Sequence, residues 1–275
     1  MASTPALGHG VGLRPRHYSE LLEHGASGIA WFEAISENFF ELGGRPLAVL
    51  SRVRRDVPVV LHGVGMGLGS THPPSADYLG RLQGLIERIE PAWISDHVCW
   101  GSADGHFTHD LLPIAFTEEM LAVLTARVLS VQDALRRPIL LENITAYLRF
   151  TQDSLVESDF LNELCSRTSA RLLLDLNNVF VNSQNFGFDP REFVGGIRPE
   201  FVEQIHLAGH SRLSTLLFDS HVGPVPEPVW SLYRFAVQRF GPVPSLVEWD
   251  EDVPELSVLR EEAARAAAIE REVLA

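Results

Sequence analysis

The sequence contains no lysine, so all 22 of its lysine-plus-arginine residues are arginine. Without a lysine amine the chain cannot form a Schiff base with a substrate, anchor pyridoxal phosphate or use a lysine as general base. Acidic residues number 36, which gives a net charge of −14. This charge argues against a protein that clamps DNA or RNA, because such proteins need a basic surface.

Cysteine and long apolar segments are also scarce. The two cysteines, Cys99 and Cys165, are expected to be free thiols of a cytoplasmic protein, because no feature indicates an extracellular setting. No run of about 18 apolar residues exists, so no membrane span is expected, and the N-terminal residues do not resemble a signal peptide. No linker divides the chain, so we expect one domain over 1–275, with a flexible N-terminus over 1–9 and a terminal helix over 253–275.

What the chain does contain is a regular alternation of short Val/Ile/Leu-rich runs and helical segments. The runs indicate strands that are buried on both faces. The expected strands cover 10–13, 31–37, 58–62, 92–97, 138–143, 171–177, 201–208 and 245–250. The expected helices between them cover 17–24, 46–55, 75–89, 117–135, 158–167, 191–195 and 228–240. Eight such units in about 250 residues predict a single α/β domain, a (β/α)8 TIM barrel, rather than an open doubly wound sheet.

Seven of these strands end in acidic or imidazole side chains. The residues at these ends are Glu37, His62, Asp96 with His97, Glu142, Asp175, His206 and Glu248. The C-terminal ends of barrel strands converge on one face, which is where active sites lie. Several acids gathered there would repel one another without cations. The sequence therefore predicts a metal site at the C-terminal face of the barrel.

Two spacings of two residues add to this set. Asp175 and Asn177 would share a face of an extended strand, and Asp219 and His221 have the same spacing. Asp96 and His97 are adjacent, so one of them at most faces the centre. The candidate metal ligands are His62, His97, Glu142, Asp175, Asn177, His206, Asp219, His221 and Glu248. With a bridging carboxylate such as Glu142 these ligands suffice for two or three ions, and imidazole plus carboxylate without thiolate suits iron, manganese or zinc.

Taken together and in order, the motifs are similar to those of a known family. They include Leu61-His62-Gly63, Ser95-Asp96-His97, Leu141-Glu142-Asn143, Leu174-Asp175-Leu176-Asn177-Asn178, Ile205-His206-Leu207-Ala208-Gly209-His210, Asp219-Ser220-His221 and Glu248-Trp249-Asp250. The series resembles the multinuclear non-haem iron-dependent oxidative enzymes (MNIO), the family of the methanobactin-maturing oxidase, long catalogued as a domain of unknown function. The resemblance extends from Gly10 to about Asp252.

The resemblance implies a barrel that holds two or three irons of mixed valence and uses O2 as co-substrate. One iron would be bound by His62, His97 and Glu142. A second would share Glu142 and add Asp175, His206 and Glu248, and a third would use Asn177, Asp219 and His221. The catalytic roles would fall on Glu142, Asp175 and His210. Four further residues would support the ligands or contact the substrate: Asp96, Asn143, Asn178 and Arg14, the last by pairing with a peptide carboxylate.

The resemblance also implies a substrate and a partner. The substrate would be a ribosomally made precursor peptide, oxidised most often at cysteine, and a separate partner protein would recognise its leader. Long loops over 101–113, 180–190 and 211–226 would leave the mouth of the barrel open to an extended chain. Two alternatives stay open: a metal-dependent phosphoesterase of the endonuclease-IV type or a sugar isomerase, and a non-catalytic barrel that binds a partner and uses metals only to hold its fold.

Overall fold

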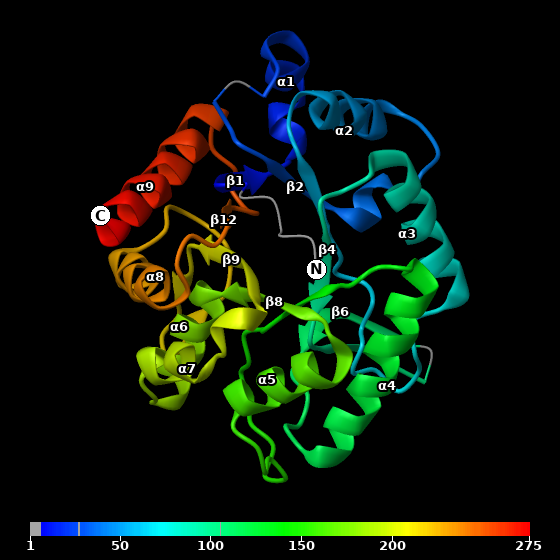
Figure 1. The fold of residues 1–275 in the computed structure, drawn as a ribbon, viewed down its shortest axis with the longest axis vertical. Coiled ribbons are helices and arrows are strands. Elements are labelled where there is room, and N and C mark those ends of the chain that lie inside the picture. Colours follow the sequence, from blue (N-terminus) through cyan, green and yellow to red (C-terminus); the bar gives the residue numbers. More distant parts are fainter. Residues whose placement is uncertain (1–6, 27, 105) are drawn as a thin grey trace.

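Eight parallel strands close into a barrel in the computed structural model, which describes residues 7–26, 28–104 and 106–275 (Figure 1). Around the barrel the order is β1 (His9–Gly12), β12 (Ser245–Glu248), β9 (Val202–Ala208), β8 (Arg171–Asp175), β7 (Leu140–Glu142), β4 (Ile94–His97), β3 (Val59–His62) and β2 (Phe32–Ile35). Because β1 pairs with both β2 and β12, the sheet has no free edge in the barrel. The predicted (β/α)8 TIM barrel is confirmed.

Helices form the layer outside the strands, as Figure 1 shows. They are α1 (Tyr18–His24), α2 (Arg45–Asp56), α3 (Ala76–Ile89), α4 (Glu118–Leu135), α5 (Glu157–Thr168), α6 (Leu176–Phe186), α7 (Pro190–Gly196), α8 (Glu227–Phe240) and α9 (Leu256–Leu274). The last helix packs against β1, so the first strand and the last helix of the described residues lie side by side. Within the described ranges, no helix has the length and apolar character needed to cross a membrane.

Several helix starts follow from local capping. The side chains of Ser75, Thr117 and Asp189 each accept a hydrogen bond from a backbone N–H in the first turn of the helix that follows. Of the segment expected to be flexible, residues 1–6 lie outside the described residues, and His9 already belongs to β1. Both cysteines are unpaired and buried.

The barrel interior has an apolar layer and a polar layer. The apolar layer consists of Trp31, Val60, Trp93, Leu140, Leu173 and Leu246. Gly10 faces this layer, and a Cβ on it would overlap the ring of Trp31, so glycine is required there. Residues two positions further along a strand lie on the same face. The polar layer is formed by the buried residues that lie two positions after those of the apolar layer: Glu33, His62, Ser95, Glu142, Asp175 and Glu248.

Three of the predicted strands end two residues earlier than expected: β2, β8 and β12, the last of which ends at Glu248. β2 ends at Ile35 and a 3-10 helix follows over Ser36–Phe39. β8 ends at Asp175, whose side chain caps α6 by accepting a hydrogen bond from Asn178 N at 2.6 Å. The helix therefore begins directly after the strand, because an aspartate after an apolar strand also serves as a helix cap.

The expected loop over 180–190 is also wrong, because most of it belongs to α6. The other two loops carry hairpins. One is β5 (Trp100–Ala103) with β6 (His106–Leu112), and the other is β10 (Ser211–Arg212) with β11 (Leu217–Phe218). Both hairpins stand on the C-terminal side of the barrel, since they follow β4 and β9.

Candidate metal centre

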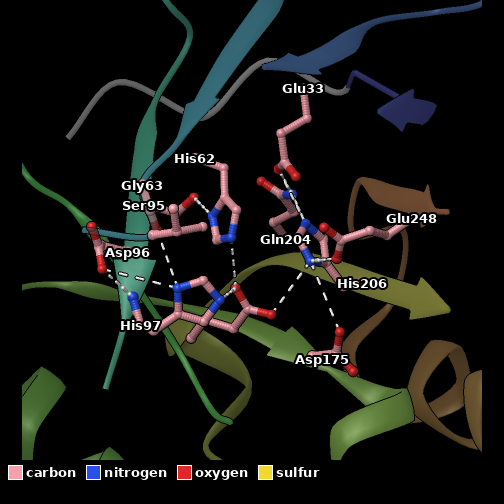
Figure 2. A network of polar contacts seen from close by, with 12 residues as sticks. Glu33, His62, Gly63, Ser95, Asp96, His97, Asp175, Gln204, His206 and Glu248 are labelled. Carbon is pink, nitrogen blue, oxygen red and sulfur yellow. Dashed lines mark hydrogen bonds and ion pairs between the residues drawn. The ribbon is translucent and has the colours of Figure 1, made fainter. Parts of the chain in front are cut away.

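Three side chains at the ends of β3, β4 and β7 face one point. Glu142 Oε2 lies 3.2 Å from Nε2 of His62 and 3.2 Å from Nε2 of His97. The Nδ1 atoms point away: that of His62 lies 2.8 Å from Ser95 Oγ, and that of His97 lies 3.1 Å from the carbonyl of Gly63 (Figure 2). A carbonyl only accepts, so His97 carries its proton on Nδ1 and turns a lone pair towards Glu142.

The charge state of these imidazoles fits a ligand role. Burial lowers the pKa of His62, and it lowers that of His97 to about 4. Both rings are therefore neutral near pH 7, as a metal ligand must be. Glu142 Oε2 is buried and has no hydrogen-bond partner. Electron pairs that converge without a proton between them are the arrangement that a cation satisfies, and these three residues form one possible metal-binding group.

A second group adjoins the first through Glu142. His206 Nδ1 lies 3.4 Å from Glu142 Oε1, 3.9 Å from Asp175 Oδ2 and 3.1 Å from Glu248 Oε2. The four residues form a fully buried group that can hold a metal. His206 Nδ1 and Asp175 Oδ2 lack hydrogen-bond partners although both are buried. Glu142 thus directs one oxygen to each group, which is the geometry of a bridging carboxylate.

The pKa values of Asp175 and His206 in the second group are both raised. Burial and the nearby Glu142 raise the pKa of Asp175 to about 8. Burial alone would lower the pKa of His206, but Glu33, Glu142 and Glu248 raise it well above its ordinary value. A buried group in which Asp175 keeps its proton and His206 carries a positive charge at neutral pH fits a site whose charge is balanced by metal ions.

A third group lies next to Glu248 and is more open to solvent. His221 Nδ1 lies 3.2 Å from Asp250 Oδ2 and 3.5 Å from Glu248 Oε2. These three residues can hold a metal, and Glu248 then belongs to two groups. On its other side, His221 Nε2 lies 2.9 Å from Asp219 Oδ1. Asp250 is an addition to the ligands expected from the sequence.

Asn177 also reaches this region. Its Nδ2 donates to Asp219 Oδ1 at 2.8 Å, and its Oδ1 accepts from His210 Nδ1 at 2.7 Å. The structure therefore brings Asn177, Asp219 and His221 together, but by a route that the sequence reasoning got wrong. Asn177 lies in the first turn of α6 and not in an extended strand, and His221 adopts a left-handed backbone with φ of 47°.

The loop that carries His221 is held against the barrel. The backbone carbonyl of His221 accepts a hydrogen bond from Asp250 N at 2.9 Å. Gly209 lies beneath the loop, and a Cβ there would overlap the carbonyl oxygen of Val222. Glycine at this position thus lets the loop approach the end of β9, which places His221 beside Glu248.

Asn143 and Asn178 fix Asp175 from behind. Asn143 Nδ2 donates to the Asp175 carbonyl at 3.0 Å, and its Oδ1 accepts from Asp175 N at 2.9 Å. Asn178 N donates to Asp175 Oδ1, and Asn178 Nδ2 donates to the Asn143 carbonyl at 3.0 Å. One oxygen of Asp175 is therefore used in the fold and the other is left for the centre.

The side chains of Asp96 and Glu37 point away from the three ligand groups and towards the loop after β3. Asp96 Oδ2 accepts from Met66 N at 3.2 Å, while Glu37 Oε1 accepts from Gly65 N at 2.8 Å and from the Tyr78 hydroxyl at 2.6 Å. Both carboxylates hold the glycine-rich loop after β3. The expectation that the second strand delivers Glu37 to the centre is wrong, because that strand ends two residues earlier.

Arg14 is not free to pair with a peptide carboxylate. Its Nε donates to Asp250 Oδ1 at 3.0 Å, its NH2 group also pairs with Asp250, and the guanidinium lies 3.6 Å from Glu248. Burial opposes the charge, but Asp250 and Glu248 raise the pKa of Arg14. Arg14 therefore balances the acids of the third group, which is a different partner from the peptide carboxylate expected from the sequence.

The sequence reasoning also missed Glu33 and Gln204. Glu33 Oε2 lies 3.1 Å from His206 Nε2, and Gln204 Nε2 donates to the same oxygen at 2.7 Å. Glu33 could have been found from the sequence, because it is a charged residue inside an apolar strand. It lies two positions after Trp31, on the same face of the strand.

Comparison with known proteins identifies the family of this chain. Residues 8–271 match the model of the family described as RiPP precursor modification enzyme MbnB/TglH/ChrH, and the chain belongs to this family. A UPF0276 protein of Anaeromyxobacter sp. (strain Fw109-5) is 51% identical over 269 residues, which cover 98% of this chain and 95% of the relative. The resemblance stated from the motifs is thereby confirmed.

Solved structures share the barrel. L-ribulose 3-epimerase superposes with a TM-score of 0.62 at 12% identity, covering 97% of this chain and 94% of that one. Endonuclease IV from Thermus thermophilus superposes with a TM-score of 0.59 at 15% identity, covering 97% and 98%. At these identities the likeness concerns the fold alone.

Proposed function

We propose that the protein is a multinuclear iron-dependent oxidase that uses O2 to modify a ribosomally synthesised precursor peptide at cysteine. The observation that carries this proposal is the set of three adjoining ligand groups, joined through Glu142 and Glu248. Membership of a family of RiPP precursor modification enzymes supports a peptide as substrate.

The donor set suits two or three irons. His62, His97 and Glu142 would hold the first, and Glu142, Asp175, His206 and Glu248 the second. The third would be held by His221, either through Nε2 together with Asn177 and Asp219 or through Nδ1 together with Glu248 and Asp250. Bound iron of mixed valence would supply electrons for O2 chemistry and a positive charge that favours an ionised substrate thiol.

The chain's own contribution is orientation and proton handling. Glu142 and Asp175 present their carboxyl groups in a pocket that is buried from solvent. His210 is half-buried at the more open side of the centre, beside Asn177. Its Nδ1 donates to the Asn177 amide oxygen, so its Nε2 carries a lone pair, and burial lowers its pKa. We propose that His210 Nε2 accepts a proton from the substrate.

A separate partner protein that recognises the leader of the precursor is part of the proposal. The apolar side chains exposed on loops of the C-terminal face, among them Phe107, Tyr147 and Phe218, are surfaces on which a peptide or partner can pack. Tyr147 and Phe218 stack with ring centroids 5.7 Å apart, and the Tyr147 hydroxyl accepts from Asp219 N at 3.0 Å. This pair therefore lies directly beside the third group.

The test is co-expression of the chain with a precursor peptide gene encoded beside it and with any leader-binding partner, in an iron-loaded, oxygenated culture. Tandem mass spectrometry of the peptide is expected to show an O2-dependent mass change at cysteine that is lost with Glu142→Gln. An unmodified peptide would refute the proposal. Modification at another residue would keep the oxidase and exclude cysteine.

The shared fold with endonuclease IV defines the control reaction. Metal-loaded protein is incubated with abasic-site DNA and simple phosphodiesters in the presence and absence of O2. Turnover that does not depend on O2 would favour a hydrolase, because metal-assisted displacement needs no oxidant. A protein that binds its partner normally but shows no activity of either kind would favour the binding-only alternative.

A further inference from the structure

A buried chain of polar contacts lies behind His206, on the side away from the ligand groups. Figure 2 shows Glu33 and Gln204 on one side of this ring and Asp175 on the other. The chain begins at Trp93, whose Nε1 donates to Gln204 Oε1. The residues of this chain are all buried inside the barrel: Trp93, Gln204, Glu33 and His206. No comparison assigns a role to Glu33, Gln204 or Trp93.

The orientation of the Gln204 amide is fixed by this contact. An indole N–H can only donate, so the oxygen of the amide faces Trp93 and its NH2 group faces inward. That NH2 group lies 2.7 Å from Glu33 Oε2 and 2.8 Å from His206 Nε2. Gln204 is therefore a hydrogen donor placed within reach of both residues.

Glu33 and Gln204 impose opposite demands on His206. Glu33 Oε2, 3.1 Å away, is an acceptor and requires a proton on His206 Nε2. Gln204 is a donor, and if its N–H were directed at Nε2 the imidazole would carry its proton on Nδ1. Nδ1 is the atom that faces Glu142, Asp175 and Glu248. A proton there would block metal binding by the second group.

We propose that Glu33 is a positioning residue that holds the Nε2 proton of His206, draws the Gln204 amide to itself, and so leaves Nδ1 as a metal ligand. A carboxylate behind a ligand histidine commonly fixes the tautomer and raises the basicity of the ring. The inference rests on the proposed function only in so far as the second group binds metal. It does not depend on the peptide substrate.

The first group offers a matched control. Ser95 stands behind His62 as Glu33 stands behind His206, since its Oγ lies 2.8 Å from His62 Nδ1. Glu33→Gln is expected to act on the second group and Ser95→Ala on the first. A purely structural role for Glu33 would instead lower stability and leave the affinities of both groups unchanged.

The experiment is an anaerobic titration of metal-free, full-length protein with Co2+, followed by visible absorption and calorimetry. Glu33→Gln is expected to weaken one of the wild-type binding events by about 10- to 100-fold and to spare the event weakened by Ser95→Ala. In Glu33→Gln with Gln204→Met the competing donor is gone, so affinity is expected to recover in part. Circular dichroism establishes that each variant is folded.

Two results would overturn the inference. A folded Glu33→Gln protein with wild-type affinities and spectrum would refute it while leaving the proposed function intact. Wild-type protein that binds a single Co2+ would refute both. If Glu33→Gln does not fold, Trp93→Phe takes its place, because it releases the Gln204 amide. A smaller loss of Co2+ affinity in Trp93→Phe, at the binding event that Ser95→Ala spares, then supports the inference. An unchanged affinity refutes it.

Discussion

Replacing Glu142 by glutamine is expected to stabilise the metal-free protein and to destroy its response to metal. The carboxylate is 1% exposed, and its Oε2 faces two imidazole lone pairs without a hydrogen bond. A glutamine NH2 group can donate to either ring. One new hydrogen bond contributes about 0.5–1.5 kcal/mol, and leaving a buried polar atom unsatisfied costs about 1–3 kcal/mol. The lost attraction to His206 offsets part of this gain.

Without metal, the Glu142→Gln variant is therefore expected to be more stable than the wild type by about 1 kcal/mol. The metal-bound state reverses the order, because Glu142 belongs to two groups. Metal at 100 times its dissociation constant stabilises a protein by about 2.7 kcal/mol per site. Two sites raise the melting temperature of a chain of this size by about 10 °C, and most of that rise is lost in the variant.

The assay is calorimetric unfolding with chelator and with anaerobic Fe2+. Glu157→Gln is the matched control, because burial raises the pKa of this carboxyl group to about 8 and the residue lies outside the three groups. It is expected to keep the rise in melting temperature. A Glu142→Gln protein that is more than about 2 kcal/mol less stable without metal, and that keeps the wild-type rise with metal, would refute the reasoning.

Four further outcomes are expected. Asp175 has a pKa raised from 3.8 to about 8 by burial and Glu142, so the folded metal-free protein binds a proton that the unfolded chain lacks, and its stability should fall as pH rises from about 4 to 8. Metal affinity of the second group should rise over the same window by up to about tenfold per pH unit, and a flat titration series between pH 6 and 8 would contradict this. Gly63→Ala places a Cβ against the Asp96 carboxylate, so it should destabilise the protein by about 1–3 kcal/mol in chemical denaturation and weaken metal binding at the His97 group. Leu174→Ala, on the outer face of β8, should cost about 2–5 kcal/mol yet leave metal stoichiometry unchanged, and altered stoichiometry would show that fold and site are not separable there.

The inward ligands could be predicted because strand geometry dictates them. His62, Glu142 and Glu248 each lie two residues after an apolar residue of the barrel interior, so a strand with period two must present both on one face. The apolar runs were enough to locate the barrel strands for the same reason. Strand ends were less certain, because Asp175 satisfies two patterns at once: the end of an inward-facing strand and the cap of a helix.

What the sequence could not provide depends on contacts between distant segments. Gln204 is polar and lies within a strand, yet only its pairing with Trp93, 111 residues away, fixes which end of its amide faces Glu33. Asp250 was visible as a second acid after Glu248, but its place beside His221 depends on a left-handed residue and on the space above Gly209.

The arrangement also explains why these supporting residues matter to the centre. The side-chain type alone makes a histidine a possible metal ligand, whereas a neighbouring group determines which ring nitrogen carries the proton. Gly63 does this for His97, Asn177 for His210 and, by our proposal, Glu33 for His206. In each case the neighbour is an acceptor that holds one ring nitrogen as N–H and leaves the other as a lone pair. A buried histidine without such a neighbour would have no reason to present a lone pair to a metal ion instead of a proton.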